Sequence, residues 1–273
     1  MRPVSKSLKE YARGVAGGLL FSLPLLYTIE VWWFGVVARP ERLLLYVCAT
    51  FVLLLGYNYF VGLRRDSCFS EVAIDSVEEM GLGLLLAAGA LWALGRITAE
   101  MTAAEIVGVT VVEAMTVAIG VSVGTAQLGG KDDGDKGEAG DGGGGEDKGV
   151  SGGRKKVSFA GQLVIAGCGA MLFAANVAPT EEIVQIAIEI AAWRLLGLAL
   201  LSLSLAALIL YYSEFAGAQK HVRFDRRHDV LVGAVVTYAA ALVVSALMLW
   251  FFGRFEGASL AVAVGQTVVL GVG

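Results

Sequence analysis

Apolar residues run along most of the chain in stretches of about 20, separated by polar segments. An apolar run of roughly 18 or more residues is long enough to cross the hydrocarbon core of a bilayer as one α-helix. The pattern therefore predicts an all-α membrane protein with eight transmembrane helices. These helices are expected at about 14–37, 43–63, 77–95, 105–126, 158–178, 190–212, 230–252 and 257–273, the last of them short.

Composition agrees with this prediction. Hydrophobic residues make up 56% of the 273 positions and charged residues only 17%, whereas soluble domains carry about 25% charged residues. The first apolar stretch is too long for the core of a signal peptide, so we expect no cleaved leader. Cysteine is present in an odd number, which does not suggest a disulfide framework. The three cysteines are Cys48, Cys68 and Cys168.

Basic residues predict the orientation of the helices. Of the 21 lysines and arginines, 16 fall before the first predicted helix or in every second connection. Basic residues remain on the cytoplasmic side of membrane proteins, so both termini are expected in the cytoplasm. All five tryptophans fall at the opposite helix ends, where an indole ring suits the outer membrane interface. They are Trp32, Trp33, Trp92, Trp193 and Trp250.

One connection differs from the others. Residues 129–156 consist largely of glycine and charged residues and offer almost nothing to bury, which predicts a disordered acidic cytoplasmic linker. The linker divides the chain into a first four-helix membrane repeat, 1–128, and a second, 157–273.

The two halves resemble each other in sequence. Residues of "GGLLFSLPLLYTIE" align with "GAMLFAANVAPTEE" at an offset of 152, and "ALWALGRI" aligns with "MLWFFGRF" further on. Each half has an even number of predicted helices, so the repeats are expected to lie parallel. Internal repeats are common in transporters, where the site lies at the repeat interface. A duplicated scaffold without a pathway is the alternative.

Glu113 is the deepest predicted carboxylate, about eight residues from the outer end of its helix, or roughly 12 Å below the surface. An isolated charge at that depth is unfavourable by several kcal/mol, so the group must be neutral, paired or facing a wet cavity. The aligned position in the second half is Leu270. Glu113 is therefore a candidate for an ion- or proton-linked group. The alternative is a protonated acid hydrogen-bonded to a neighbouring helix with help from Thr110 or Thr116.

Glu30 and Glu182 occupy aligned positions near the outer helix ends, and Arg42 and Arg194 are aligned in the same way. A glutamate–arginine pair within each half is one interpretation. An acidic ring that attracts cations at an extracellular mouth is the other, which makes both glutamates candidates for ion- or proton-linked groups.

Pro24 predicts a kink in the first helix, because proline lacks a backbone donor. Asn176 takes the aligned position in the second half and Pro179 follows it, so all three are candidate kink residues. Broken helices line ion sites in several transporter folds, although proline kinks are also ordinary in membrane helices.

No motif for an enzyme, a metal site or a cofactor is present in the sequence. The acidic residues Asp75, Glu78 and Glu79 share one face of a predicted helix near the cytoplasm. We expect them to be solvated.

The segments "RGVAGGLLFSLPLLYTIEVWW" and "FVLLLGYNYFVGLRRD" resemble an uncharacterised bacterial family of integral membrane proteins that is classed as a domain of unknown function. The resemblance implies a location in the bacterial cytoplasmic (inner) membrane and no specific activity. Arg13 with Phe21 and Ser22 is distantly similar to the first helix of a family of bacterial and lysosomal potassium channels. In that family the arginine is closer and an aspartate stands where this chain has Leu23.

The function expected is a small-cation or proton-coupled transporter or channel. The alternative is a non-transporting sensory or scaffold protein that acts through its cytoplasmic loops. The expected partners are the lipid bilayer and small cations or protons, a homo-oligomer is compatible with the pattern, and no nucleic acid is expected.

Overall fold

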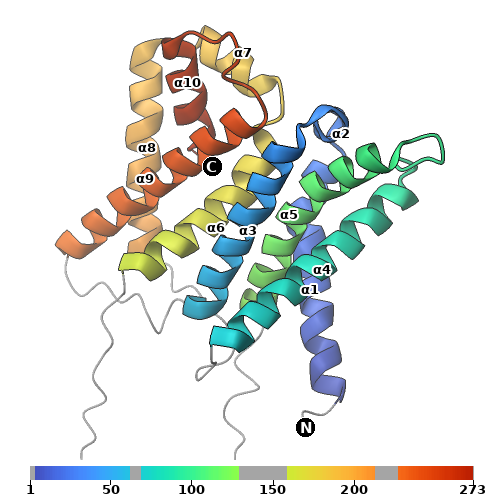
Figure 1. Ribbon diagram of the computed structural model, residues 1–273. Coiled ribbons are helices and arrows are strands. Elements are labelled where there is room, and N and C mark those ends of the chain that lie inside the picture. The colour runs from blue at the N-terminus through green and yellow to red at the C-terminus, as the bar shows by residue number, and fades with distance from the viewer. Residues whose placement is uncertain (1–3, 62–68, 129–158, 213–226, 273) are drawn as a thin grey trace, which may run out of the picture.

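The computed structural model describes residues 4–61, 69–128, 159–212 and 227–272, and within these ranges every regular element is an α-helix (Figure 1). Each predicted apolar stretch contains at least one α-helix, whereas the acidic linker lies outside the described residues. The helices are α1 (Val4–Leu26), α2 (Ile29–Val37), α3 (Pro40–Val61), α4 (Phe69–Ala93), α5 (Ala103–Gln127), α6 (Phe159–Val177), α7 (Glu182–Glu189), α8 (Ala192–Tyr212), α9 (Arg227–Phe251) and α10 (Leu260–Leu270).

Five of the described helices are long and apolar enough to cross a membrane, or six if α1 and α2 together form one broken span. The prediction of eight spans is therefore not matched by this count. α4 is not among the helices counted as candidate spans, and it carries four acids in its first half: Glu71, Asp75, Glu78 and Glu79. α10 is outside this count because its 11 residues rise only about 16 Å, half of the roughly 30 Å hydrocarbon core.

The first predicted span is broken. α1 ends two residues after Pro24, and α2 leaves it at an angle of 87°. Proline removes one donor from the helical ladder and clashes with the preceding turn, so the helix opens there. The single kinked helix predicted for 14–37 is thus two helices, and the Trp32–Trp33 pair lies on the short second one.

α5 is the central helix of the first half and packs against α1, α2, α3 and α4. Glycines allow the closest of these contacts. A Cβ atom added at Gly17 on α1 would lie 2.4 Å from the Cα of Gly124 on α5, and one at Gly108 on α5 would lie 2.1 Å from the carbonyl oxygen of Gly35 on α2. Small residues bring helices together where lipid supplies no hydrophobic drive for association.

The helices of the second half pack mainly around α9. α6 packs against α9, and α9 against α8, which is the least buried of the candidate spans. α10 packs against α7, α9 and α8 and ends near Leu242, in the middle of α9. Figure 1 shows α10 beginning at the top of the view beside the start of α8 and running down to end beside α9.

Two helix ends have the same geometry in both halves. Gly95 after α4 and Gly253 after α9 both have left-handed backbone, with φ of 66° and 73°. The next residue in each case, Arg96 or Arg254, donates its backbone N–H across the end of the helix at 2.8 Å, to Leu91 or Leu249. This type of helix end requires a residue with a positive φ, which is why glycine stands there in both halves.

The two halves meet mainly through α6, which packs against α3 and α1 (Figure 1). Near the start of α3, Arg42 Nη2 lies 2.8 Å from Glu256 Oε1 in the loop after α9. Phe251 at the end of α9 stacks on Tyr46 of α3 with ring centroids 4.4 Å apart. The halves are therefore joined by both apolar and polar contacts.

Candidate functional site

Glu113 lies in the middle of the central helix α5, and its side chain is 0% exposed. Neither carboxylate oxygen has a hydrogen-bond partner among the described residues. In native structures almost every buried polar atom is hydrogen-bonded, so a fully buried carboxyl group with two unpaired oxygens requires an explanation. The explanation can be a protonated acid, a bound water or a bound ion.

Glu113 shares one face of α5 with Val117, Gly120 and Gly124, since their spacing of four, three and four residues repeats the helical turn. This face meets α1, which runs antiparallel to α5. Because Gly18 of α1 lies against Val117 and Val121, the antiparallel register brings Glu113 level with Pro24 and the residues just after it. The buried carboxyl group therefore lies at the height of the break in α1.

α3 supplies a polar side chain, Tyr46, to this region. The Tyr46 hydroxyl lies 3.1 Å from the hydroxyl of Thr116, one turn along α5 from Glu113. Tyr46 is also close enough to Glu113 for the two groups to interact electrostatically. Sequence analysis did not identify Tyr46, because nothing in an apolar stretch shows which of its aromatic residues faces a buried acid.

Two further hydroxyls in this region, those of Thr50 on α3 and Thr110 on α5, are buried without a partner. Thr116 bonds to Tyr46 and Thr110 to nothing that is described, so the hydrogen bond from either threonine to Glu113 is not formed. The site thus combines the two unpaired oxygens of Glu113 with two unpaired threonine hydroxyls, which simple apolar packing of helices does not need.

Asn176 on α6 completes the site at the break. Its Oδ1 accepts the backbone N–H of Leu25 at 2.9 Å, and its Nδ2 donates to the carbonyl of Phe21 at 3.0 Å. In an intact helix these two backbone groups would bond to each other, since they are four residues apart. The Asn176 amide is inserted between them and satisfies both. By the sequence alignment Asn176 is the counterpart of Pro24, so the two aligned positions meet in space.

The remaining predicted residues lie away from this centre. Glu30 is half-buried in the first turn of α2, and Glu182 is exposed in the first turn of α7. Neither forms an ion pair within the described part of the chain. Arg42 pairs with Glu256 instead of Glu30, and Arg194 packs over the ring of Trp193. Pro179 is buried in the turn between α6 and α7, where it limits the length of α6.

Glu79 differs from the sequence-based expectation. It was expected to be solvated, but its Oε2 accepts a hydrogen bond of 2.8 Å from Asn58 Nδ2 on α3. The amide of Asn58 also bonds to Ser76 and Ser122. A polar residue within the apolar stretch of α3 was the available signal for this contact.

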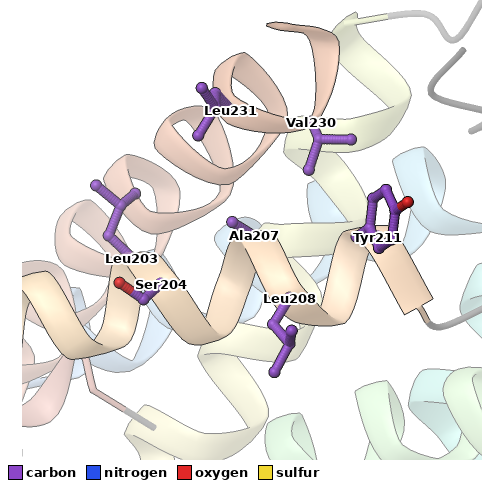
Figure 2. Close-up of a pocket in the computed structure, with 7 residues that line it drawn as sticks. All are labelled: Leu203, Ser204, Ala207, Leu208, Tyr211, Val230 and Leu231. Atoms are coloured by element: carbon purple, nitrogen blue, oxygen red, sulfur yellow. The ribbon is translucent and has the colours of Figure 1, made fainter. Parts of the chain in front are cut away.

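A groove on the surface of the second half is lined by residues of α8 and α9 (Figure 2). Its walls are apolar, and the one serine hydroxyl there bonds to the backbone of its own helix at 2.7 Å. The lining residues are Leu203, Ser204, Ala207, Leu208, Tyr211, Val230 and Leu231.

Among the described residues no cluster of three or more His, Cys, Asp or Glu side chains could hold a metal ion. A family model described as "Putative integral membrane protein (DUF2391)" matches residues 10–273. Neither a curated protein nor a solved structure matches the chain.

Proposed function

The chain belongs to this family of integral membrane proteins, and we propose that it is a small-cation or proton-coupled transporter or channel. In this proposal Glu113 is the group that binds the ion or proton. The single observation that carries the proposal is the pair of unpaired carboxylate oxygens of Glu113 in the interior of α5.

A purely structural role explains this carboxyl group poorly. A buried polar group without a partner destabilises a protein by about 1–3 kcal/mol, and an ionised one by more. The aligned residue of the second half is Leu270, which is also buried, so a helix of this kind does not need an acid there. A group that lowers stability and has a simple apolar replacement is typical of a functional site.

Duplication of a four-helix unit supports the same proposal. The left-handed glycines after α4 and α9, with the same pair of hydrogen bonds at each, are what two copies of one ancestral unit would have. On this interpretation α1 with α2, α3, α4 and α5 form one repeat. α6 with α7, α8, α9 and the shorter α10 form the parallel second repeat, and the candidate site lies near their interface.

In this proposal the conformation is a closed one, because the Glu113 side chain has no exposed surface. Exchange of an ion or proton therefore requires a movement of α1 or α2, and the break after Pro24 is the natural hinge. Glu30, half-buried beyond the break on α2, and Glu182, at the start of α7, place negative charge at the outer ends, which favours cations over anions.

Flux measurements in proteoliposomes test the proposal. Purified protein is reconstituted and tested against gradients of Na⁺, K⁺, Ca²⁺ and H⁺, and the variant Glu113→Gln is compared with wild type. Glu105→Gln is the matched control. It removes an acid at the exposed start of the same helix, where glutamine can also cap the N-terminus with Thr102.

We expect wild-type and Glu105→Gln protein to carry flux and Glu113→Gln protein to lose it while eluting as the same folded species. Wild-type-like flux in Glu113→Gln would remove Glu113 from the mechanism. No flux in the wild type under any gradient would favour the second function, a non-transporting sensory or scaffold protein acting through its cytoplasmic loops. The closed environment of Glu113 is the observation in favour of that alternative.

A further inference from the structure

A second acid is held in the interior of the first half. Glu79 on α4 is half-buried, and it is fixed by Asn58 of α3, which also bonds to Ser122 of α5 at 3.1 Å. Ser76, one turn before Glu79, bonds to the same amide at 3.1 Å. Three helices thus converge on one carboxylate through neutral polar groups, and no described cation pairs with it.

The titratable groups around Glu79 come from each helix packed near it. Asp75 and Glu78 lie on α4 itself, Tyr57 on α3 and Cys168 on α6. Tyr11 of α1 reaches Glu78 at 3.5 Å. None of these groups supplies a positive charge. Glu79 is therefore not held as the carboxylate of an ion pair, and it can gain and lose a proton more readily than a paired acid.

The position of Glu79 relative to Glu113 follows from α5. Ser122, in the Glu79 network, is nine residues after Glu113, which corresponds to roughly 13 Å along the helix axis. Because Gly14 near the start of α1 lies against Val121 and Thr125, Glu79 lies nearer the end of the bundle where α1 starts, and Glu113 lies nearer the break in α1. The half-buried acid of α4 and the buried acid of α5 are therefore at different heights along α5.

The surface between α3 and α5 connects them. Every fourth residue of α3 from Tyr46 is buried toward α5 and its neighbours, namely Tyr46, Thr50, Leu54 and Asn58. Three of these four side chains are polar. Tyr46 hydrogen-bonds to Thr116 of α5 and Asn58 to Ser122 of α5. We name the contact formed by these six residues the α3–α5 seam, and Leu54, which is 0% exposed, is its one apolar residue.

We propose that the α3–α5 seam is a proton route between Glu79 and Glu113 and that Leu54 closes it. The inference rests on the proposed function and makes the transported or coupled ion a proton. The Glu79 carboxylic acid loses its O–H proton, the Glu113 carboxylate gains one, and water that enters the opened seam carries the proton past Leu54. Hydroxyl groups suit this task because each accepts one proton as it donates another.

The seam fits a proton better than a metal cation. Alkali and alkaline-earth ions take about six to eight oxygen ligands. Each end of the seam offers one carboxylate, and the Tyr46–Thr116 and Asn58–Ser122 pairs at these ends are already bonded within each pair.

Proton flux in proteoliposomes containing a pH-sensitive dye, driven by a pH step, tests the inference. Leu54→Asn replaces the apolar residue with a polar one of similar size, and Leu54→Met is the apolar control of nearly the same volume. Glu79→Gln removes the second acid, and Glu78→Gln is its control, an exposed acid on the adjacent position. Leu54→Thr is a second polar variant if the asparagine variant does not fold.

We expect Leu54→Asn or Leu54→Thr to raise proton flux several-fold and Leu54→Met to leave it near the wild-type rate. Glu79→Gln should lower flux about tenfold or more, as expected when a proton-transfer group is removed, and Glu78→Gln should not. Wild-type flux in Glu79→Gln and the polar Leu54 variants, together with loss of flux in Glu113→Gln, would overturn the seam and leave the proposed function standing. Absence of proton flux in the wild type would overturn the seam, and loss of all cation flux as well would overturn the proposed function.

Discussion

At the scale of single residues, Glu113 has an instructive counterpart in the second half. Gln266 on α10 is 1% exposed, and neither its amide oxygen nor its nitrogen has a described partner. In the alignment Gln266 corresponds to Val109, one turn before Glu113 on the same helix face. Each half therefore has a buried amide or carboxyl group without a described partner on its last helix, and of these two groups only Glu113 can ionise.

This comparison leads to a prediction about stability. Glu113→Leu copies the residue of the second half and removes an unpaired carboxyl group from the interior, so it should raise the free energy of unfolding by about 1–3 kcal/mol. Thermal unfolding in detergent, followed by circular dichroism, measures the change. A lower melting temperature for Glu113→Leu would mean that the carboxyl group has a stabilising partner in the folded protein.

Asn176 gives a prediction of the opposite sign. Asn176→Leu leaves the N–H of Leu25 and the carbonyl of Phe21 without partners, which should destabilise the protein by about 1–3 kcal/mol for each group. Asn176→Asp keeps the acceptor for Leu25 and should retain more stability than the leucine variant at a pH where the carboxyl group is protonated. Equal stability of wild type and Asn176→Leu would mean that α1 closes its own hydrogen bond when the amide is absent.

At the scale of elements, the contact between α1 and α5 sets the shape of the first half. Gly17 and Gly169 are aligned residues of α1 and α6, but their surroundings differ. A Cβ atom at Gly17 would collide with the backbone of α5, whereas one at Gly169 would meet nothing within 4 Å. Aligned helices thus have different partners in the two halves.

The two glycines form a matched pair for mutagenesis. Gly17→Ala should separate α1 from α5 and lower the free energy of unfolding by about 1–3 kcal/mol, as overpacking does. Gly169→Ala should be neutral or stabilising by about 0.5–1 kcal/mol, because alanine favours a helix over glycine. Melting temperatures of the two variants under one condition make the comparison. Equal effects would contradict the close contact at Gly17.

The apolar part of each long helix was predictable from the chain, but the polar first turns of α1 and α4 were not, so those helices begin about ten and eight residues before the predicted spans. α7 was missed because its eight residues are too few to form a recognisable stretch. The break after Pro24 was expected as a kink, since a sequence indicates where a donor is missing but not how far the chain turns. Glu113 could be selected from its position alone. Asn58 and Glu79 could not be paired, because a partner 21 residues away on another helix leaves no trace in the local pattern.

At the scale of the whole molecule, the halves are not mirror copies in their contacts. α6 packs closely against α3. By the alignment α6 corresponds to α1 and α3 to α8, but among the described residues α1 and α8 form no comparable contact. α5 is enclosed by five helices, α1, α2, α3, α4 and α6, whereas α8 is the least buried of the candidate spans.

The orientation in the membrane can be tested on the same scale. In a variant without native cysteines, Lys9→Cys should react only with reagents that enter the cytoplasm, and Glu100→Cys should react with impermeant reagents from outside intact bacterial cells. Basic residues near α1 remain inside according to the positive-inside rule. Glu41→Cys, at the same end of the bundle as Glu100, is the internal control. Labelling of Lys9→Cys from outside would reverse the proposed orientation.

The spacing of the two buried acids also has an electrical consequence. A proton that moves between Glu79 and Glu113 would travel roughly 13 Å of a hydrocarbon core about 30 Å thick. It would cross about two-fifths of the membrane potential, so 100 mV would change the free energy of that step by about 1 kcal/mol. A bacterium with an energised membrane would then drive the step in one direction several times faster than the other. The separation of the two acids, measured along α5, would make proton transfer sensitive to voltage without any dedicated voltage sensor.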